Sequence, residues 1–222
     1  MDVARIHKLN DKPVKSGPVI YWMSRDQRVR DNWALIHAAF KAAQTGAPLV
    51  VIFCLLPTFQ GAGWRHYAFM LQGLRELEES LAGMNIAFRV IPGDPVKGMT
   101  AAIEEYSAGL VVADFDPLRV KRRWRRTVAA GAKIRCEEVD AHNIAPCRHV
   151  SKKQEYAAHT LRPKINKLLP EFLHEYPDIE EPVGKSGPPA VDWAELYRTL
   201  EVDDRTPGAA WISPGERAAA AA

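Results

Sequence analysis

Five short segments carry the side chains best suited to binding a ligand. They combine aromatic, arginine, aspartate and amide groups, and each follows a predicted buried strand: Met23–Arg28, Phe53–Pro57, Gly93–Asp94, Phe115–Arg119 and Asp140–Asn143. In parallel α/β sheets, ligands bind outside the carboxyl ends of the strands, where these segments would meet. Aromatic faces with polar neighbours suit a flat heteroaromatic ligand with polar edges. The alternative is that these are the ordinary polar loops of such a sheet.

Several other chemistries are disfavoured because their motifs are missing. No GxGxxG follows the first predicted strand and no GxxxxGK[ST] occurs, which argues against a dinucleotide or P-loop phosphate site. Residues 24–28 contain no glycine, so a pyrophosphate could not closely approach their main chain; nucleotide binding of another kind stays open. The cysteines form no CxxC pair, there is no GxSxG, and His142, His149 and His159 lack the spacing of metal ligands.

Residues 118–130 form a strongly basic segment in a chain whose formal net charge is only +3. Arg119, Arg122, Arg123 and Arg126 follow the i, i+3, i+4, i+7 spacing of one helix face. Such a stripe could follow phosphates, but outer helices of doubly wound folds commonly carry charged solvent faces. We favour a solvated outer face, with Val120 and Trp124 on the buried side.

The elements that would position these residues alternate regularly along the chain. Apolar runs predict strands at 18–23, 48–55, 86–91, 109–115 and 134–139, and helical spacing predicts helices at 27–45, 64–84, 94–106 and 118–130. Strands that are apolar on both faces and joined by helices imply a parallel sheet covered on both sides. The predicted fold is therefore α/β: a Rossmann-like doubly wound five-stranded parallel sheet with flanking helices, plus a helical C-terminal extension.

The character of the sequence changes after Asn143. Residues 151–174 are predicted to be helical with interruptions at Pro163 and Pro170, and the proline-rich stretch 177–190 to be a linker. A short helix is predicted at 191–202. Ser213-Pro214-Gly215-Glu216 has the form of a helix start with Ser213 as N-cap, but only alanines and one arginine follow. The N-terminus is not a signal peptide and no apolar run could span a bilayer, so we expect a cytoplasmic protein with no membrane partner.

Three groups of motifs carry a resemblance to a known family. They are Tyr21–Arg28 (YWMSRDQR) with Asp31–Leu35 (DNWAL), Val139–Asn143 (VDAHN) with Pro146-Cys147, and Glu155–Thr160 (EYAAHT) with Arg162–Lys164 (RPK). These segments resemble the N-terminal α/β domain of class II cyclobutane pyrimidine dimer (deoxyribodipyrimidine) DNA photolyases, over about residues 17–176. The resemblance implies an α/β domain at 17–145, a connector and linker at 146–190, and the start of a helical FAD domain at 191–222.

The resemblance also implies cofactors and site residues. Family members are two-domain enzymes that use light to split pyrimidine dimers flipped out of DNA. Their α/β domain can hold an antenna chromophore, in some members of the 8-hydroxy-5-deazaflavin type, and FAD lies in the helical domain. Matching the antenna groove gives the candidate chromophore-binding residues Met23, Arg25, Asp26, Arg28, Asn32, Phe53, Cys54, Phe115, Asp116, Asp140 and His142.

Each candidate has a role that the resemblance implies and an alternative role in supporting the fold. Arg25 and Asp26 would hydrogen-bond the polar edge of the chromophore, Phe53 and Phe115 would form apolar walls, and Asp140 would orient the site. Asp26 could instead be the N-cap of the first helix.

We expect the helical FAD domain to be truncated in this chain, so that the chain alone lacks repair activity. Two alternatives remain: a stand-alone chromophore- or nucleotide-binding module, or half of a split enzyme that docks a separate FAD-domain subunit. DNA is an expected partner through the family resemblance. Uncovered apolar residues at 151–176 are expected to favour self-association: Leu161, Ile165, Leu168, Leu169 and Phe172.

Overall fold

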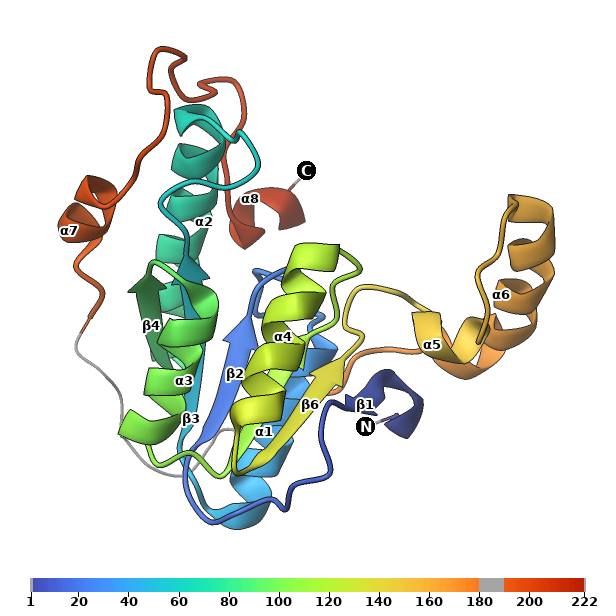
Figure 1. Ribbon diagram of the computed structural model, residues 1–222. Coiled ribbons are helices and arrows are strands. Elements are labelled where there is room, and N and C mark those ends of the chain that lie inside the picture. Colours follow the sequence, from blue (N-terminus) through green and yellow to red (C-terminus); the bar gives the residue numbers. More distant parts are fainter. Residues whose placement is uncertain (1, 180–189, 222) are drawn as a thin grey trace.

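A computed structural model describes residues 2–179 and 190–221 and contains a six-stranded sheet in the order β1-β6-β5-β2-β3-β4 (Figure 1). The strands are β1 Ile6–Lys8, β2 Val19–Met23, β3 Leu49–Leu55, β4 Ala87–Pro92, β5 Leu110–Asp114 and β6 Arg135–Val139. Strands β2 to β6 are parallel, as expected, and β1 pairs antiparallel with β6. The expected five-stranded sheet is therefore corrected to six strands with one antiparallel edge.

Two layers of helices cover the sheet. Helices α1 (Trp33–Thr45) and α2 (Trp64–Ala82) pack on one face, and α3 (Pro95–Glu105) and α4 (Arg119–Gly131) pack on the other. The central strands supply apolar side chains to both layers: in β2, Tyr21 faces one core and Trp22 the other. This two-sided burial explains why the strands are almost continuously apolar in sequence.

The first helix begins later than its sequence pattern suggested. It starts at Trp33, and Asn32 is its N-cap, with the side-chain oxygen accepting from the main-chain N–H groups of Ala34 and Leu35. The prediction of a helix from residue 27 with Asp26 as a cap was wrong, because residues 24–31 fold into a loop held by contacts from other strands. Gly46, at φ 64°, ends the helix in the left-handed conformation that glycine adopts without strain.

Edge strand β1 is anchored by a buried arginine. Arg5 precedes β1 in a short 3₁₀ turn, Val3–Arg5, and is 2% exposed. Its guanidinium donates to the main-chain oxygens of Asp140, Asn143 and Ile144 at 3.2, 2.8 and 2.6 Å. It also lies 4.8 Å from the ring centre of Trp33, a cation–π distance. The N-terminal segment is thus joined to the loop that leaves β6.

Strand β6 carries two buried acidic residues, each matched by basic groups. His37 Nε2 of α1 lies 2.8 Å from Glu137 Oε2. On the opposite face, Glu138 lies between Arg125 of α4 and Arg148, at 2.9 and 2.7 Å. Buried carboxylates are tolerated when they are paired in this way.

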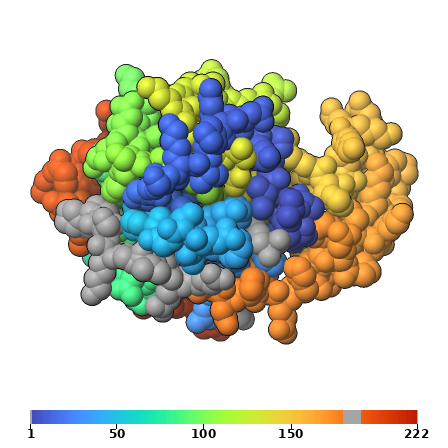
Figure 2. Space-filling view, turned by 90° about the horizontal axis from the view of Figure 1, so that it is seen from below, coloured from blue at the N-terminus to red at the C-terminus, as the bar shows by residue number. Residues whose placement is uncertain are grey.

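The chain after β6 forms a short helix α5 (Cys147–Val150) and a longer helix α6 (Ala158–Phe172). Figures 1 and 2 show α6 as an arm that stands beside the main body. Pro163 and Pro170 lie inside α6, so the expected interruptions are wrong. Phe172 is also not uncovered as expected, because it is 2% exposed and packs against His149 and Arg5. The other apolar residues of this set are half-buried, which agrees with the prediction that they are partly uncovered: Leu161, Ile165, Leu168 and Leu169.

Helices α7 (Trp193–Arg198) and α8 (Glu216–Ala220) lie along α2. Glu78 of α2 accepts from the Val191 N–H and the Trp193 indole, both at 2.7 Å. The Glu216 carboxylate accepts from the N–H groups of Val29 and Arg30 at 3.0 and 2.6 Å, which ties α8 to the loop after β2.

Two expectations for the C-terminal part differ from the structure or fall outside it. The N-cap of α8 is Gly215, so the prediction that Ser213 caps this helix was wrong. The linker predicted at 177–190 lies largely outside the described residues, which omit 180–189.

Candidate functional site

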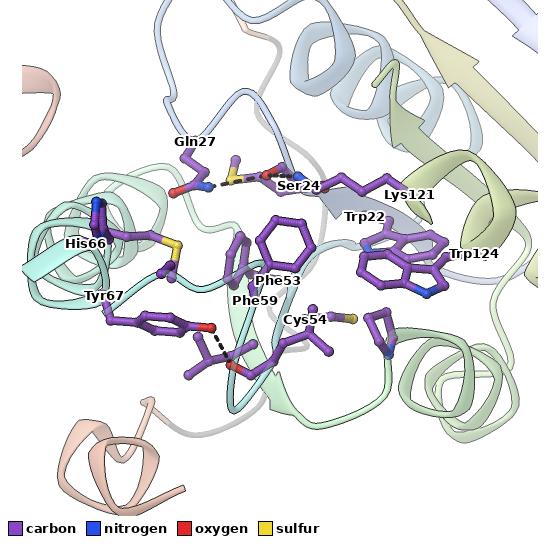
Figure 3. A pocket seen from close by; sticks show the side chains of 16 residues that line it. Trp22, Ser24, Gln27, Phe53, Cys54, Phe59, His66, Tyr67, Lys121 and Trp124 are labelled. Carbon is purple, nitrogen blue, oxygen red and sulfur yellow. Dashed lines mark hydrogen bonds between the residues drawn. The ribbon is translucent and has the colours of Figure 1, made fainter. Parts of the chain in front are cut away.

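A cavity of about 220 Å³ opens where β2 and β3 end, at the carboxyl edge of the sheet. Its wall is completed by the loop after each strand and by the first turns of α2, α3 and α4 (Figure 3). The side chains that line it are Trp22, Met23, Ser24, Gln27, Phe53, Cys54, Leu55, Leu56, Phe59, Ala62, His66, Tyr67, Met70, Pro95, Lys121 and Trp124. This is the position at which doubly wound sheets bind ligands.

Six of the sixteen residues that line the cavity carry aromatic rings. Figure 3 shows Trp22 and Trp124 on one side, His66 and Tyr67 on the other, and Phe53 and Phe59 between them. The rings of Phe59 and Trp124 have centres 6.2 Å apart and are tilted by 48°. The Tyr67 hydroxyl donates to the Leu56 carbonyl at 3.0 Å, so it is already satisfied within the protein. The arrangement suits a flat aromatic guest that stacks between rings.

A few polar groups stand at one edge of this apolar surface. Lys121 Nζ lies 3.1 Å from Asp116 Oδ2 and 5.8 Å from the ring centre of Phe59. The amide nitrogen of Gln27 donates to the Ser24 carbonyl at 3.2 Å, which leaves the Gln27 amide oxygen as an acceptor on the cavity side. These groups could orient a guest that carries polar or anionic atoms on one edge.

The cysteine in the cavity wall is chemically quiet. Burial raises the pKa of the Cys54 thiol to about 12. The thiol stays protonated at neutral pH, and a thiol is a much poorer nucleophile than a thiolate. Cys54 therefore acts as an apolar wall and not as a point of covalent attachment.

The loop after β2 is held in place by hydrogen bonds to Asp114, the last residue of the neighbouring strand β5. One carboxylate oxygen of Asp114 accepts from the N–H groups of Ser24, Arg25 and Asp26 at 2.8, 2.8 and 3.1 Å. The other oxygen accepts from the Tyr21 hydroxyl at 2.6 Å. These N–H groups point at a carboxylate, so they cannot bind the phosphates of a nucleotide as the first loop of dinucleotide-binding domains does.

Burial strongly affects this carboxylate. Desolvation, and then the negative charge of Asp26, raises the pKa of Asp114 above its ordinary value of 3.8, against the effect of its hydrogen bonds. Asp114 thus holds the loop mainly because its oxygens are placed to accept the loop's hydrogen bonds, and its buried negative charge lowers the stability of the fold.

Three of the eleven candidate residues line the cavity: Met23, Phe53 and Cys54. A second group forms a polar network beside it. The buried Asp26 Oδ1 lies 2.7 Å from Arg28 and 3.2 Å from His142 Nδ1. Arg25 is half-buried in the same loop. Their assignment to a chromophore stays a prediction.

The remaining candidates shape the loops around the cavity. Asn32 caps α1, and Asp116 accepts from the Leu118 N–H and pairs with Lys121. Asp140 accepts from the N–H groups of Asn143 and Cys147. Asp140 and Phe115 line a second, more polar cavity of about 130 Å³ beside β1.

Thirteen of the sixteen cavity residues were not among the candidates from sequence, and four of these shape its aromatic and polar surface: Trp22, Phe59, Lys121 and Trp124. Trp22 was assigned to a buried strand and Trp124 to the buried side of the basic helix, and both are indeed largely covered by protein. The available signal was the position of each residue next to a strand end. An aromatic residue at the end of a strand, or in the first turns of the helix that follows it, lies near the carboxyl edge of the sheet.

The fold is that of a doubly wound α/β protein, and it carries an aromatic cavity at the carboxyl edge of its sheet. Comparison with known proteins makes this more specific. The family model for DNA photolyase matches residues 19–183. The chain therefore belongs to the DNA photolyase family.

Curated relatives agree with this assignment. The chain is 42% identical over 209 residues to a deoxyribodipyrimidine photo-lyase of Arabidopsis thaliana, covering 91% of this chain and 42% of the relative. It is 42% identical over 205 residues to the protein of the same name from Potorous tridactylus, covering 90% and 38%. For Oryza sativa subsp. japonica the identity is 38%, covering 96% and 44%. The chain thus spans less than half the length of these relatives.

Across residues 2–179 and 190–221, no helix combines the length and the apolar character needed to cross a membrane.

Proposed function

We propose that this chain is the chromophore-binding α/β part of a light-driven DNA-repair protein of the deoxyribodipyrimidine photo-lyase type, of the class II branch. The observation that carries the proposal is the cavity of Trp22, Phe53, Phe59 and Trp124 at the carboxyl edge of the sheet, with Lys121 at its polar edge. The names of the relatives support the repair role. The motifs at 21–28, 139–143 and 155–160 support the class II branch.

The cavity residues fit an antenna chromophore of the 8-hydroxy-5-deazaflavin type. Aromatic side chains would hold its flat ring system, and the cavity of about 220 Å³ matches the ring part of such a molecule, with any chain extending into solvent. The bound group supplies the absorption of light. The protein residues orient it and exclude water, and Lys121 would stabilise a negative charge on its hydroxyl-bearing edge.

FAD, the other cofactor of the family, is assigned to no residue of this chain. We expected residues 191–222 to begin a helical FAD-binding region; the described residues among them, 191–221, form α7, α8 and the segment between them along α2. Their membership of that region remains part of the proposal.

A titration of the purified chain with 8-hydroxy-5-deazariboflavin tests the proposal. Binding should shift the visible absorption band of the chromophore and quench its fluorescence. Trp124→Ala and Phe53→Ala should each weaken binding about tenfold, because each removes a stacking surface worth about 0.5–1.5 kcal/mol beyond its buried area. Trp211→Ala is the matched control, since Trp211 is 82% exposed and does not line the cavity.

Two results would count against the proposal. One is an unchanged spectrum at about 100 μM protein, since sites of this kind bind well below that concentration. The other is equal weakening by the control and the cavity variants. Lys121→Met adds a test of the polar edge: the pKa of the bound chromophore hydroxyl should rise when the ammonium group is removed.

A further inference from the structure

Helix α4 differs in charge from the other long outer helices. Six of its thirteen residues are basic and none is acidic: Arg119, Lys121, Arg122, Arg123, Arg125 and Arg126. By contrast, α2 places Arg65 and Arg75 among three glutamates, and α3 places Lys97 with two. A generally charged surface does not explain why α4 carries six charges of a single sign.

Two of the six basic residues have partners inside the protein. Arg125 is 4% exposed and pairs with Glu138, and Lys121 pairs with Asp116 at the cavity. The other four are exposed and lie on one face of the helix, and we refer to them as the basic stripe: Arg119, Arg122, Arg123 and Arg126. Within the described part of the chain, no carboxylate forms a salt bridge with the basic stripe. At 1.5 Å per residue, the stripe is about 10 Å long.

The basic stripe does not serve the stability of α4. Like charges three and four residues apart repel one another across successive helical turns. Arg119 is the first residue of α4, where the helix dipole disfavours a positive charge, and Arg122 and Arg123 follow within the next turn. Because these charges oppose the helix and form no salt bridge with the carboxylates of residues 2–179 and 190–221, an anionic partner is the simplest reason for their placement.

The positive field extends from α4 toward β1 and α5. Loss of hydration on burial, and then the charge of Arg148, lowers the pKa of His7 in β1; Glu138 opposes this, and Arg126 of the basic stripe adds a smaller lowering. Glu138, which is buried between α4 and α5, is shared by two arginines and so cannot neutralise the surface. Figure 1 shows α4 on the outer face of the sheet, over the β5–β6 side and next to the edge where β1 lies.

We propose that the basic stripe of α4 binds phosphate groups of a DNA duplex, which gives the α/β domain its own sequence-independent contact with DNA. The inference rests on the DNA-repair part of the proposed function, and it adds where on the α/β domain the DNA would be contacted. Guanidinium groups bind phosphate oxygens in a bidentate geometry, and such contacts position a protein on DNA without reading its sequence. A stripe of about 10 Å can reach successive phosphates along one strand.

The test measures binding of the full chain to an undamaged duplex of about 20 base pairs by fluorescence anisotropy, at a series of KCl concentrations. Each phosphate contact contributes about 0.9 to the slope of log affinity against log salt concentration. The double variant Arg122→Gln with Arg126→Gln should reduce the slope by about 1.8 and weaken binding about tenfold or more at low salt. Gln keeps a helix propensity close to that of Arg, so α4 should remain folded.

A matched control has the same change of charge on another outer helix. Arg65→Gln with Arg75→Gln removes two exposed arginines from α2, and it should leave the salt slope unchanged. The melting temperature of the α4 variant should be equal to or above that of the wild type, because repulsion within the helix is relieved. A lower melting temperature would mean that the stripe serves the fold.

The remaining outcomes are also decisive. Absence of duplex binding by the wild type, an unchanged slope in the α4 variant, or equal losses in both double variants would overturn the proposal. If the α4 double variant lost binding to vesicles containing anionic phosphatidylserine but kept its binding to the duplex, the stripe would be assigned to a membrane surface instead. The chromophore titration is a separate measurement, so a failed stripe leaves the cavity assignment intact, and a failed cavity assignment leaves the stripe to be judged by DNA binding alone.

Discussion

Replacing Asp114 with alanine should destabilise the protein by about 3–5 kcal/mol. The change leaves three main-chain N–H groups of the loop after β2 without an acceptor, and it removes the partner of the Tyr21 hydroxyl. An unsatisfied buried donor costs about 1–3 kcal/mol. The N–H group of Asp26 is buried and belongs near the top of that range, while those of Ser24 and Arg25 are partly buried and can recover some bonding to water. A total of about 3–5 kcal/mol is a large share of the usual 5–15 kcal/mol of a domain.

Asp114→Asn should cost much less, about 1–2 kcal/mol. The amide oxygen can accept from the same three N–H groups. The Tyr21 hydroxyl can turn toward the Asn32 side-chain oxygen, now 3.5 Å away. The negative charge is not needed, because burial already raises the pKa of Asp114 and so disfavours the ionised form.

Urea unfolding followed by circular dichroism, with the slope m checked for constancy, measures both changes. Tyr21→Phe is the control that removes one of the four hydrogen bonds to Asp114, together with the contact of the Tyr21 hydroxyl with Asn32, and leaves the three main-chain bonds in place. If the asparagine variant is as unstable as the alanine variant, the loop is held by charge and the reasoning from acceptor geometry is refuted.

Three further outcomes are expected. Arg5→Met should lower stability by about 2–4 kcal/mol in thermal unfolding, because its three bonds to main-chain oxygens are lost in a buried site; a loss under about 0.5 kcal/mol, the size usual for a surface substitution, would show that β1 needs no such anchor. Burial alone would raise the pKa of Glu137, but its histidine partner and nearby cations lower it overall, so the stability that Glu137 contributes should be full above pH 4.5 and disappear as the pH falls through the lowered pKa. The difference in stability between wild type and Glu137→Gln, measured across pH, should therefore close in acid, and a difference that widened would refute the pairing. A thiol reagent at pH 8 should modify the exposed Cys147 first, because burial raises the pKa of both Cys54 and Cys136 to about 12; fast labelling of either would contradict their placement.

The parallel part of the sheet was predictable because its signal is local. The runs at 18–23 and 48–55 differ from β2 and β3 by one residue at their starts, since strands buried on both faces are apolar throughout. Strand β1 gave no such signal. Its residues Ile6–Lys8 include one apolar side chain, and the strand exists because β6 has a free edge and Arg5 is anchored beside it.

The start of α1 and the details of the cavity could not be read from local pattern. The helix was predicted from residue 27, but residues 24–31 form a loop whose N–H groups bond to distant carboxylates: those of residues 24–26 to Asp114, about ninety positions away, and those of Val29 and Arg30 to Glu216. The cavity similarly depends on which strand ends are neighbours: Trp22 and Phe53 meet because β2 and β3 are adjacent in the sheet. The sequence indicated the correct edge of the sheet, and the folded chain selects the side chains that face each other there.

The bonding of the loop after β2 to Asp114 also bears on how this domain can evolve. Since that carboxylate occupies the main-chain donors of residues 24–26, the proposed function implies that selectivity for a chromophore would reside in side chains such as Gln27, Phe59 and Lys121. Side chains can be exchanged one codon at a time, whereas a main-chain phosphate cradle changes only with the path of the backbone. A lineage that carries this scaffold can therefore adopt a new pigment, or discard one, by point substitution while the sheet beneath is inherited unchanged.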